Sequence, residues 1–94
     1  MNAKESFESL GYTQILLSRK HDTDRIRYEK TLDQDEHGRT QKVIEFCFNT
    51  HRVTVWHEKK TFKGVTSWVR QNSSASLNLN EFTALQKQIH ELLW

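Results

Sequence analysis

The chain has 94 residues, the size of one small domain with a modest core. It contains no proline, three glycines and one cysteine, which excludes a glycine-rich phosphate-binding loop and an intrachain disulfide. A net charge of +2 is low for a dedicated nucleic-acid binder, and a mimic of DNA would be strongly acidic. The first predicted element is a short helix over residues 3–10, because Ala3, Phe7 and Leu10 share one face and Gly11 suits a helix end. So short a helix must dock on the rest of the chain, and we expect Phe7 and Leu10 to make that contact.

Alternation of apolar and polar residues then predicts β-strands. The clearest pattern lies in the segment 42–49, where Ile44, Phe46 and Phe48 point to one side. Further strands are predicted over 13–20, 25–31 and 52–58.

The segments between and after these strands predict turns and a fifth strand. The polar segment 33–39 contains Gly38 and predicts a hairpin turn. A fifth strand is expected over 62–69, with Gly64 as a bulge or bend, and a loop rich in Ser and Asn over 71–76.

The segment 77–94 predicts an amphipathic helix. Asn78 is a suitable N-cap and Glu81 completes a capping box. Leu77 and Phe82 occupy the positions of a hydrophobic staple. The apolar stripe, with spacings of three and four residues, consists of Phe82, Leu85, Ile89 and Leu92.

These elements predict a single α+β domain over residues 1–94. It would contain a short N-terminal helix, an antiparallel sheet of four or five strands, and a C-terminal helix packed on one sheet face. The face under the helix is expected to carry Ile26, Tyr28, Ile44, Phe46, Phe48, Val53 and Val55. The opposite face is expected to carry Arg25, Arg27, Glu45, Thr54 and Trp56.

Basic and aromatic residues on the uncovered face are the candidate binding residues. Such residues bind nucleic acid through phosphate contacts and stacking, and Trp and Arg are also enriched in protein interfaces. The simpler interpretation, with Arg stems packed over Trp56 on an ordinary surface, is favoured, because Glu29 and Glu45 dilute the positive charge there. A protein partner is the next choice. The candidate partner-binding residues are Arg25, Arg27, Trp56, Lys59, Lys60 and Trp68.

Two features of this candidate set are left open by the sequence. Lys59, Lys60 and Lys63 form a second basic cluster at an expected turn, where a solvated loop is the default. Each of the three tryptophans fits the core and an interface equally well.

No catalytic or metal site is predicted. The segment 33–38 resembles the start of a calcium loop, but His37 and Ile44 stand where oxygen ligands are needed. His51 and His57 would lie roughly 20 Å apart on one strand, at about 3.3 Å per residue, and cannot share an ion. Zinc ligation by His21, His37 and His90 would require convergence that the sequence does not indicate. Cys47, without an evident base, is expected to be an ordinary strand residue. We therefore expect no cofactor, no metal and no enzymatic activity.

Three parts of the chain resemble a known group of proteins. Residues 7–12 read Phe-Glu-Ser-Leu-Gly-Tyr, residues 26–30 are followed by Ile44-Glu45-Phe46, and residues 77–94 form the predicted helix. This order is similar to that of small, mostly uncharacterised proteins of phages and prophages of Gram-positive bacteria. Those open with Phe-x-x-Leu-Gly-Tyr and end a helix with Glu-Leu-Gly-Trp, whereas this chain has Leu93 in place of that Gly.

The resemblance implies a context but no reaction. Small phage proteins often bind host or phage proteins, and some inhibit host defence. The leading hypothesis is therefore a non-enzymatic inhibitor of a host protein such as a CRISPR-Cas nuclease, and the alternative is a nucleic-acid-binding accessory protein. Because no apolar run reaches the ~18 residues needed to span a membrane, we expect it in the cytoplasm of a bacterial host cell.

Overall fold

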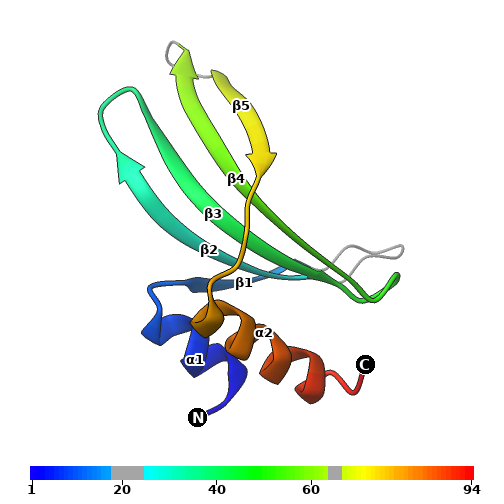
Figure 1. The fold of residues 1–94 in the computed structure, drawn as a ribbon. Helices are drawn as coiled ribbons and strands as arrows, with labels where there is room; N and C mark the ends of the chain where they lie inside the picture. The colour runs from blue at the N-terminus through cyan, green and yellow to red at the C-terminus, as the bar shows by residue number, and fades with distance from the viewer. Residues whose placement is uncertain (18–24, 64–66) are drawn as a thin grey trace.

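A computed structural model describes residues 1–17, 25–63 and 67–94 (Figure 1). For residues 62–63 and 67–71 it describes the backbone but not the side chains. It confirms the predicted α+β architecture, with five antiparallel strands between two helices in the sequence. The elements are α1 (Ala3–Ser9), β1 (Thr13–Leu17), β2 (Arg25–Gln34), β3 (Gly38–Cys47), β4 (Arg52–Lys63), β5 (Ser67–Ser74) and α2 (Leu79–Glu91).

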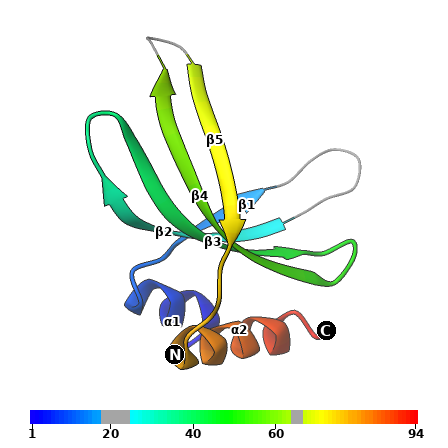
Figure 2. The same cartoon turned by 45° about the horizontal axis from the view of Figure 1, so that its top comes forward.

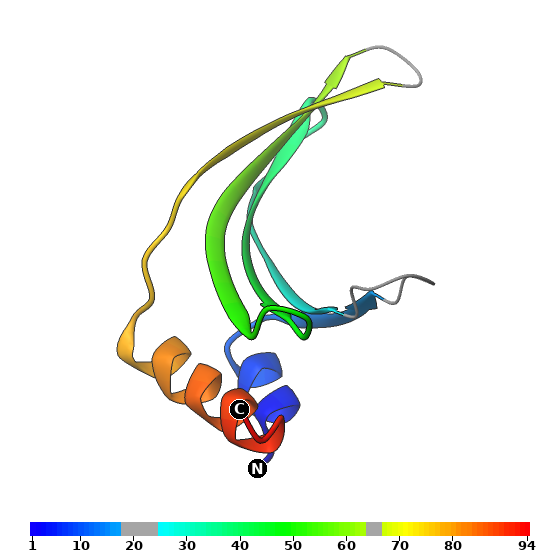
Figure 3. The same ribbon diagram turned by 90° about the vertical axis from the view of Figure 1, so that its right-hand side faces the viewer.

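The sheet is a simple meander that bends sharply along its strands. The strand order is β1-β2-β3-β4-β5, so each strand pairs with its neighbour in the sequence. One end of the sheet lies over both helices, and the β2–β3 and β4–β5 hairpins continue well beyond them (Figures 1 and 2). The helices lie on the convex side of the bend, which leaves the concave side facing away from them (Figure 3).

The core lies between the two helices and the convex side of the sheet. Phe7 of α1 is fully buried and stacks on Tyr28 of β2 with ring centroids 4.0 Å apart, so the predicted docking of α1 is confirmed. The buried cluster consists of Phe7, Tyr12, Ile26, Tyr28, Ile44, Phe46, Ala84 and Leu85. Leu10, Phe48, Val53 and Val55 pack against it, so the sheet face predicted to lie under the helix is the core face.

The prediction for α2 was wrong at Phe82, which is 47% exposed. The buried side of α2 instead contains Glu81, Ala84, Leu85 and Gln88. Consecutive residues on a helix lie 100° apart, so a helix that turns Glu81 toward the sheet must turn Phe82 outward. Ile89 and Leu92 pack against the core as expected.

Glu81 takes this position because it joins a buried polar cluster at the start of α2. Its carboxylate accepts a hydrogen bond from Lys42 Nζ at 2.7 Å and another from the Tyr12 hydroxyl. The same carboxylate accepts the N–H of Asn78 at 2.9 Å, while the Asn78 side chain accepts the Glu81 N–H at 2.8 Å. The predicted capping box is therefore confirmed, and it also connects α2 to the sheet.

The boundaries of the strands differ from the sequence prediction at both hairpins. The turn expected over 33–39 is shorter, since β2 continues to Gln34 and β3 begins at Gly38. The fifth strand was placed too early, because Phe62 and Lys63 end β4 and the strand runs from Ser67 to Ser74. Its polar half was predicted as a loop, but backbone pairing with β4 needs no apolar pattern. The predicted bulge at Gly64 and the end of the first predicted strand, 18–20, lie outside the described residues.

Candidate functional site

The concave side of the sheet carries charged and aromatic side chains from its three central strands. The register places Arg27 opposite Glu45, and Glu45 opposite Thr54. Two residues further along the same strands, Val43 lies opposite Trp56. Because side chains alternate between the faces of a sheet, all of these point away from the helices. The bend brings them together, and Val43 and Glu45 are buried on this side although no helix covers it.

Glu45 holds two arginines at the centre of this face. Its Oε2 accepts hydrogen bonds from Nε and Nη2 of Arg27 at 2.9 and 2.7 Å, and its Oε1 accepts one from Nη1 of Arg25 at 2.7 Å. Arg27 also lies 3.5 Å from Glu29. Burial alone would lower the pKa of Arg27, but the hydrogen bond and charge of Glu45 outweigh it and raise that pKa. Two guanidinium groups therefore face two carboxylates, and this cluster has no net charge.

Trp56 lies beside this ion cluster. The guanidinium carbon of Arg27 is 5.5 Å from the centre of the Trp56 ring, within range for a cation–π contact. Arg27 is on β2 and Trp56 on β4, so the two side chains meet across β3, above Val43. The indole N–H of Trp56 is buried, and no residue that the structure describes accepts a hydrogen bond from it. Trp56 is held as a rigid, half-buried ring on the open side of the sheet.

The same face continues toward the hairpin tips with a second neutral group. Gln41 Nε2 donates to Glu58 Oε2 at 2.6 Å, and Lys60 Nζ lies 3.7 Å from the same oxygen. Gln41 and Glu58 are both buried. The register also places Arg39, opposite Lys60, and Arg52, opposite Cys47, on this face. The described part of the concave face therefore presents paired charges around an aromatic ring, together with two further cations.

The structure brings together most of the candidate residues named from the sequence. Arg25, Arg27 and Trp56 share the concave face as expected, and Lys60 lies further along it. Lys59 points to the opposite face and is exposed, because it is adjacent to Lys60 in a strand. The expected turn at these lysines was wrong, since they lie inside β4. The side chain of Trp68 lies outside the described residues.

Two groups of side chains on this face either were not predicted from the sequence or were given too small a role. Glu45 was expected only to dilute positive charge, but it organises both arginines. Gln41 and Glu58 were not considered, although the alternation that places Glu45 and Trp56 on this face extends to both. Trp94, left open between core and interface, packs at the edge of the core, with ring centroids 6.3 Å from Phe46 and from Phe48.

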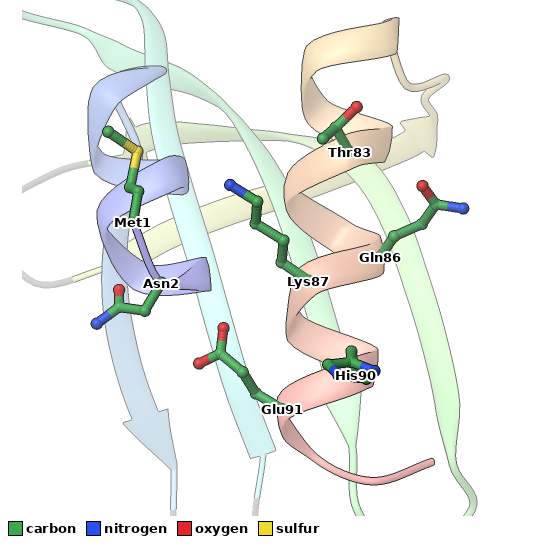
Figure 4. A pocket seen from close by; sticks show the side chains of 7 residues that line it. All are labelled: Met1, Asn2, Thr83, Gln86, Lys87, His90 and Glu91. Atoms are coloured by element: carbon green, nitrogen blue, oxygen red, sulfur yellow. The ribbon is translucent and has the colours of Figure 1, made fainter.

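A separate, shallow groove of 670 Å³ lies between α1 and α2 (Figure 4). The side chains of Lys87 and Glu91 extend from α2 toward α1 there (Figure 4). Lys87 donates to the Ser6 hydroxyl at 3.1 Å, and Glu91 accepts the backbone N–H of Ala3 at 2.6 Å. Both charged groups therefore serve to join the helices, and the groove offers no free pair of charges to a ligand.

The segment that resembles the start of a calcium loop forms the β2–β3 turn. The Asp35 carboxylate accepts the N–H groups of His37 and Gly38 at 2.7 and 2.9 Å. These backbone hydrogen bonds lower the pKa of Asp35. Among the described residues, no three His, Cys, Asp or Glu side chains gather closely enough to hold a metal ion. His21, named in the metal hypothesis, lies outside that set.

Comparison of the chain with known protein families, with curated proteins and with solved structures found no match. Within the residues that the structure describes, no helix is long and apolar enough to cross a membrane.

Proposed function

We propose that this chain is a non-enzymatic binding module that recognises another protein through the concave face of its sheet. The observation that carries this proposal is the arrangement at Glu45, where both guanidinium groups are already paired. Trp and Arg are the residue types most often found as anchors in protein interfaces. Here both are fixed in place before any partner arrives, which lowers the entropy cost of association.

A nucleic-acid partner is the alternative function, and the same pairing argues against it. Binding to nucleic acid gains its free energy mainly from cations that neutralise phosphates. On this face Arg25, Arg27 and Lys60 lie within 4 Å of Glu45, Glu29 or Glu58. Among the described residues this leaves the cations of Arg39 and Arg52 for phosphate, fewer than a nucleic-acid interface usually offers. We expect no measurable affinity for single- or double-stranded DNA or RNA in a fluorescence anisotropy titration at about 50 mM salt. Tight, salt-dependent binding would instead support the accessory-protein function.

The specific partner that we propose is a host protein, and most specifically a CRISPR-Cas nuclease of a Gram-positive bacterium. This step is supported by the resemblance to phage and prophage proteins alone. It predicts that the purified protein inhibits DNA cleavage by such a nuclease loaded with its guide RNA. If cleavage is unaffected while another host protein is captured, the proposed nuclease is wrong and the binding function stands.

The binding face itself is tested with two matched variants. Thr54→Arg places a long, charged side chain on the concave face beside Glu45, and Thr83→Arg places the same side chain on the outer surface of α2. Both threonines are exposed, so both variants should fold. Affinity purification from phage-sensitive hosts should recover a partner with the wild type and with Thr83→Arg, and should lose it with Thr54→Arg. Equal recovery by all three proteins, or no partner from several hosts, would contradict the proposal.

A further inference from the structure

The strand β1 forms one edge of the sheet and exposes its backbone to pairing. It contacts β2 on one side, with Thr13 opposite Glu29 and Leu17 opposite Arg25. Within the described parts of the chain, residues 13–17 make no backbone hydrogen bond outside that pairing. Its outward N–H and C=O groups can therefore accept another strand.

Apart from its short length, the described part of this edge lacks charge, proline and bulges, three features by which sheet edges prevent association. Natural edge strands carry charged residues, a proline or a bulge. β1 reads Thr-Gln-Ile-Leu-Leu, with none of these side chains and with a register that is continuous along its length. Leu16 is 69% exposed, so pairing at this edge can remove apolar surface from water. β5, at the other edge, is by contrast polar and contains Arg70.

We propose that β1 pairs with β1 of a second copy of this chain, antiparallel about a twofold axis at Ile15. This register places Thr13 opposite Leu17 of the second copy, and Gln14 opposite its Leu16. The strand has no charged side chain, so self-pairing brings no like charges together. The two Leu16 side chains become diagonal neighbours about 7–8 Å apart, within reach of one another, and cover each other's exposed surface.

The absence of charge on β1 also favours a second copy over an unrelated protein. A strand of another protein would find no ionic group on β1 to select it. Twofold pairing uses the same surface on both molecules, so a single contact covers the β1 edge of each copy. The assembly is then a closed dimer that adds no further copy at this edge. The five-stranded sheets of the two copies would form one continuous sheet. A ladder of five residues is a small interface, below the roughly 1,000 Å² of a stable complex, so the dimer should be weak.

The test is the molar mass in solution, measured by sedimentation equilibrium from about 10 to about 500 µM. The wild-type mass should rise with concentration from 11.2 kDa toward twice that value. Leu16→Lys adds a charge at the edge and should remain at 11.2 kDa throughout. Leu79→Lys changes another exposed leucine, on α2, and should associate like the wild type. Circular dichroism checks that both variants are folded, and Leu16→Thr, which keeps the strand propensity, should weaken association if Leu16→Lys does not fold.

Amide hydrogen exchange locates the contact independently of the variants. Backbone amides within residues 13–17 should gain protection at high protein concentration, and amides of β5 should not. A wild type that stays monomeric over the whole range would overturn the proposal. So would association that survives in Leu16→Lys or is lost in Leu79→Lys. None of these outcomes depends on whether the concave face binds a partner.

Discussion

Leu93 adopts a backbone conformation that leucine disfavours. Its φ is 60°, in the left-handed region that is unfavourable for residues with a Cβ atom. Its side chain is 90% exposed, so packing contacts offset little of this backbone strain. We expect Leu93→Gly to raise the free energy of unfolding by about 0.5–1 kcal/mol, after the greater freedom of Gly in the unfolded chain is subtracted. Urea denaturation measures this change.

Leu93→Ala is the matched control for the backbone effect. Alanine removes most of the side chain but keeps the Cβ atom that makes the left-handed conformation unfavourable. It should therefore leave the stability close to that of the wild type. Equal stabilisation by Ala and Gly would mean that the exposed leucine side chain, and not the backbone, is the source of the effect.

Glu45 is the residue whose loss should change the concave face most. With Glu45→Gln, the guanidinium groups of Arg25 and Arg27 lose the carboxylate that they share. The stability should fall by about 1–3 kcal/mol, because charged hydrogen bonds are replaced by weaker ones at a buried position. The affinity for DNA should rise at low salt, since two cations become available to phosphate. Thermal melts and anisotropy titrations measure the two effects, and a variant that gains no DNA affinity would show that the pairing does not control the charge of this face.

At the scale of elements, α2 is held by different residues from those that its sequence pattern indicates. Leu85 is buried in the core, whereas Phe82 lies on the flank of the helix and is 47% exposed. Leu85→Ala should lower the free energy of unfolding by roughly 2–5 kcal/mol, the usual range for truncation in a core. Phe82→Ala should lower it less, by about 1 kcal/mol, because about half of the side chain is exposed. Chemical denaturation of both variants tests the orientation of the helix, and the reverse order of effects would restore the predicted stripe.

The buried cluster at the start of α2 predicts a dependence of stability on pH. Burial alone would raise the pKa of Glu81, but the hydrogen bonds from Lys42 and Tyr12 outweigh it and hold the pKa below its ordinary value of 4.5. A carboxyl group with a lowered pKa in the folded state stabilises the fold above its ordinary pKa, and that contribution is lost as the pH falls. The wild type should therefore lose stability below about pH 4.5.

Glu81→Gln isolates this contribution. At neutral pH it should cost about 3 kcal/mol, because it leaves the buried Lys42 ammonium group without its carboxylate. Between pH 5 and pH 3 its stability should fall less steeply than that of the wild type, since this carboxyl group is no longer present to be protonated. Denaturation midpoints across that range measure the difference, and parallel curves for the two proteins would contradict the assignment.

The elements that the sequence predicted well are those with a strong repeat of apolar residues. Ile44, Phe46 and Phe48 recur at every second position, as do Ile26 and Tyr28, and this spacing identified the core face of the sheet. The residues that decided the rest are polar. Glu81 turns α2 through ionic contacts with residues far away in the sequence, and β5 is formed by backbone pairing with little apolar alternation. Alternation along each strand was enough to predict which residues lie on the concave face. The contact of both Arg25 and Arg27 with Glu45 could not be predicted in this way, because it depends on how β2 and β3 are aligned with each other.

At the scale of the whole molecule, the bend divides the sheet into a part supported by helices and a part without them. The residues 43–46 of β3 are buried, while residues 32–37 at the end of the β2–β3 hairpin are exposed. Local opening is easier where few apolar contacts hold a segment. We expect amides near the hairpin end to exchange roughly 30-fold faster or more than those of 43–46, about 2 kcal/mol in the free energy of opening. Hydrogen exchange measures this, and uniform protection along β3 would show that the hairpin does not depend on the helices.

The meander order also bears on how fast the protein folds. Every strand pairs with its neighbour in the sequence, so the sheet is built from contacts of low contact order, which favour rapid folding. The contacts of the helices differ, because they join residues that are far apart in the sequence. The hydrogen bond from Ala3 to Glu91 joins residues 88 positions apart, and the one from Tyr12 to Glu81 joins residues 69 positions apart. Hairpins should therefore form early and the joining of α1 to α2 should come late. Substitutions in β2 and β3 would then mainly slow folding, and substitutions between the helices would mainly speed unfolding.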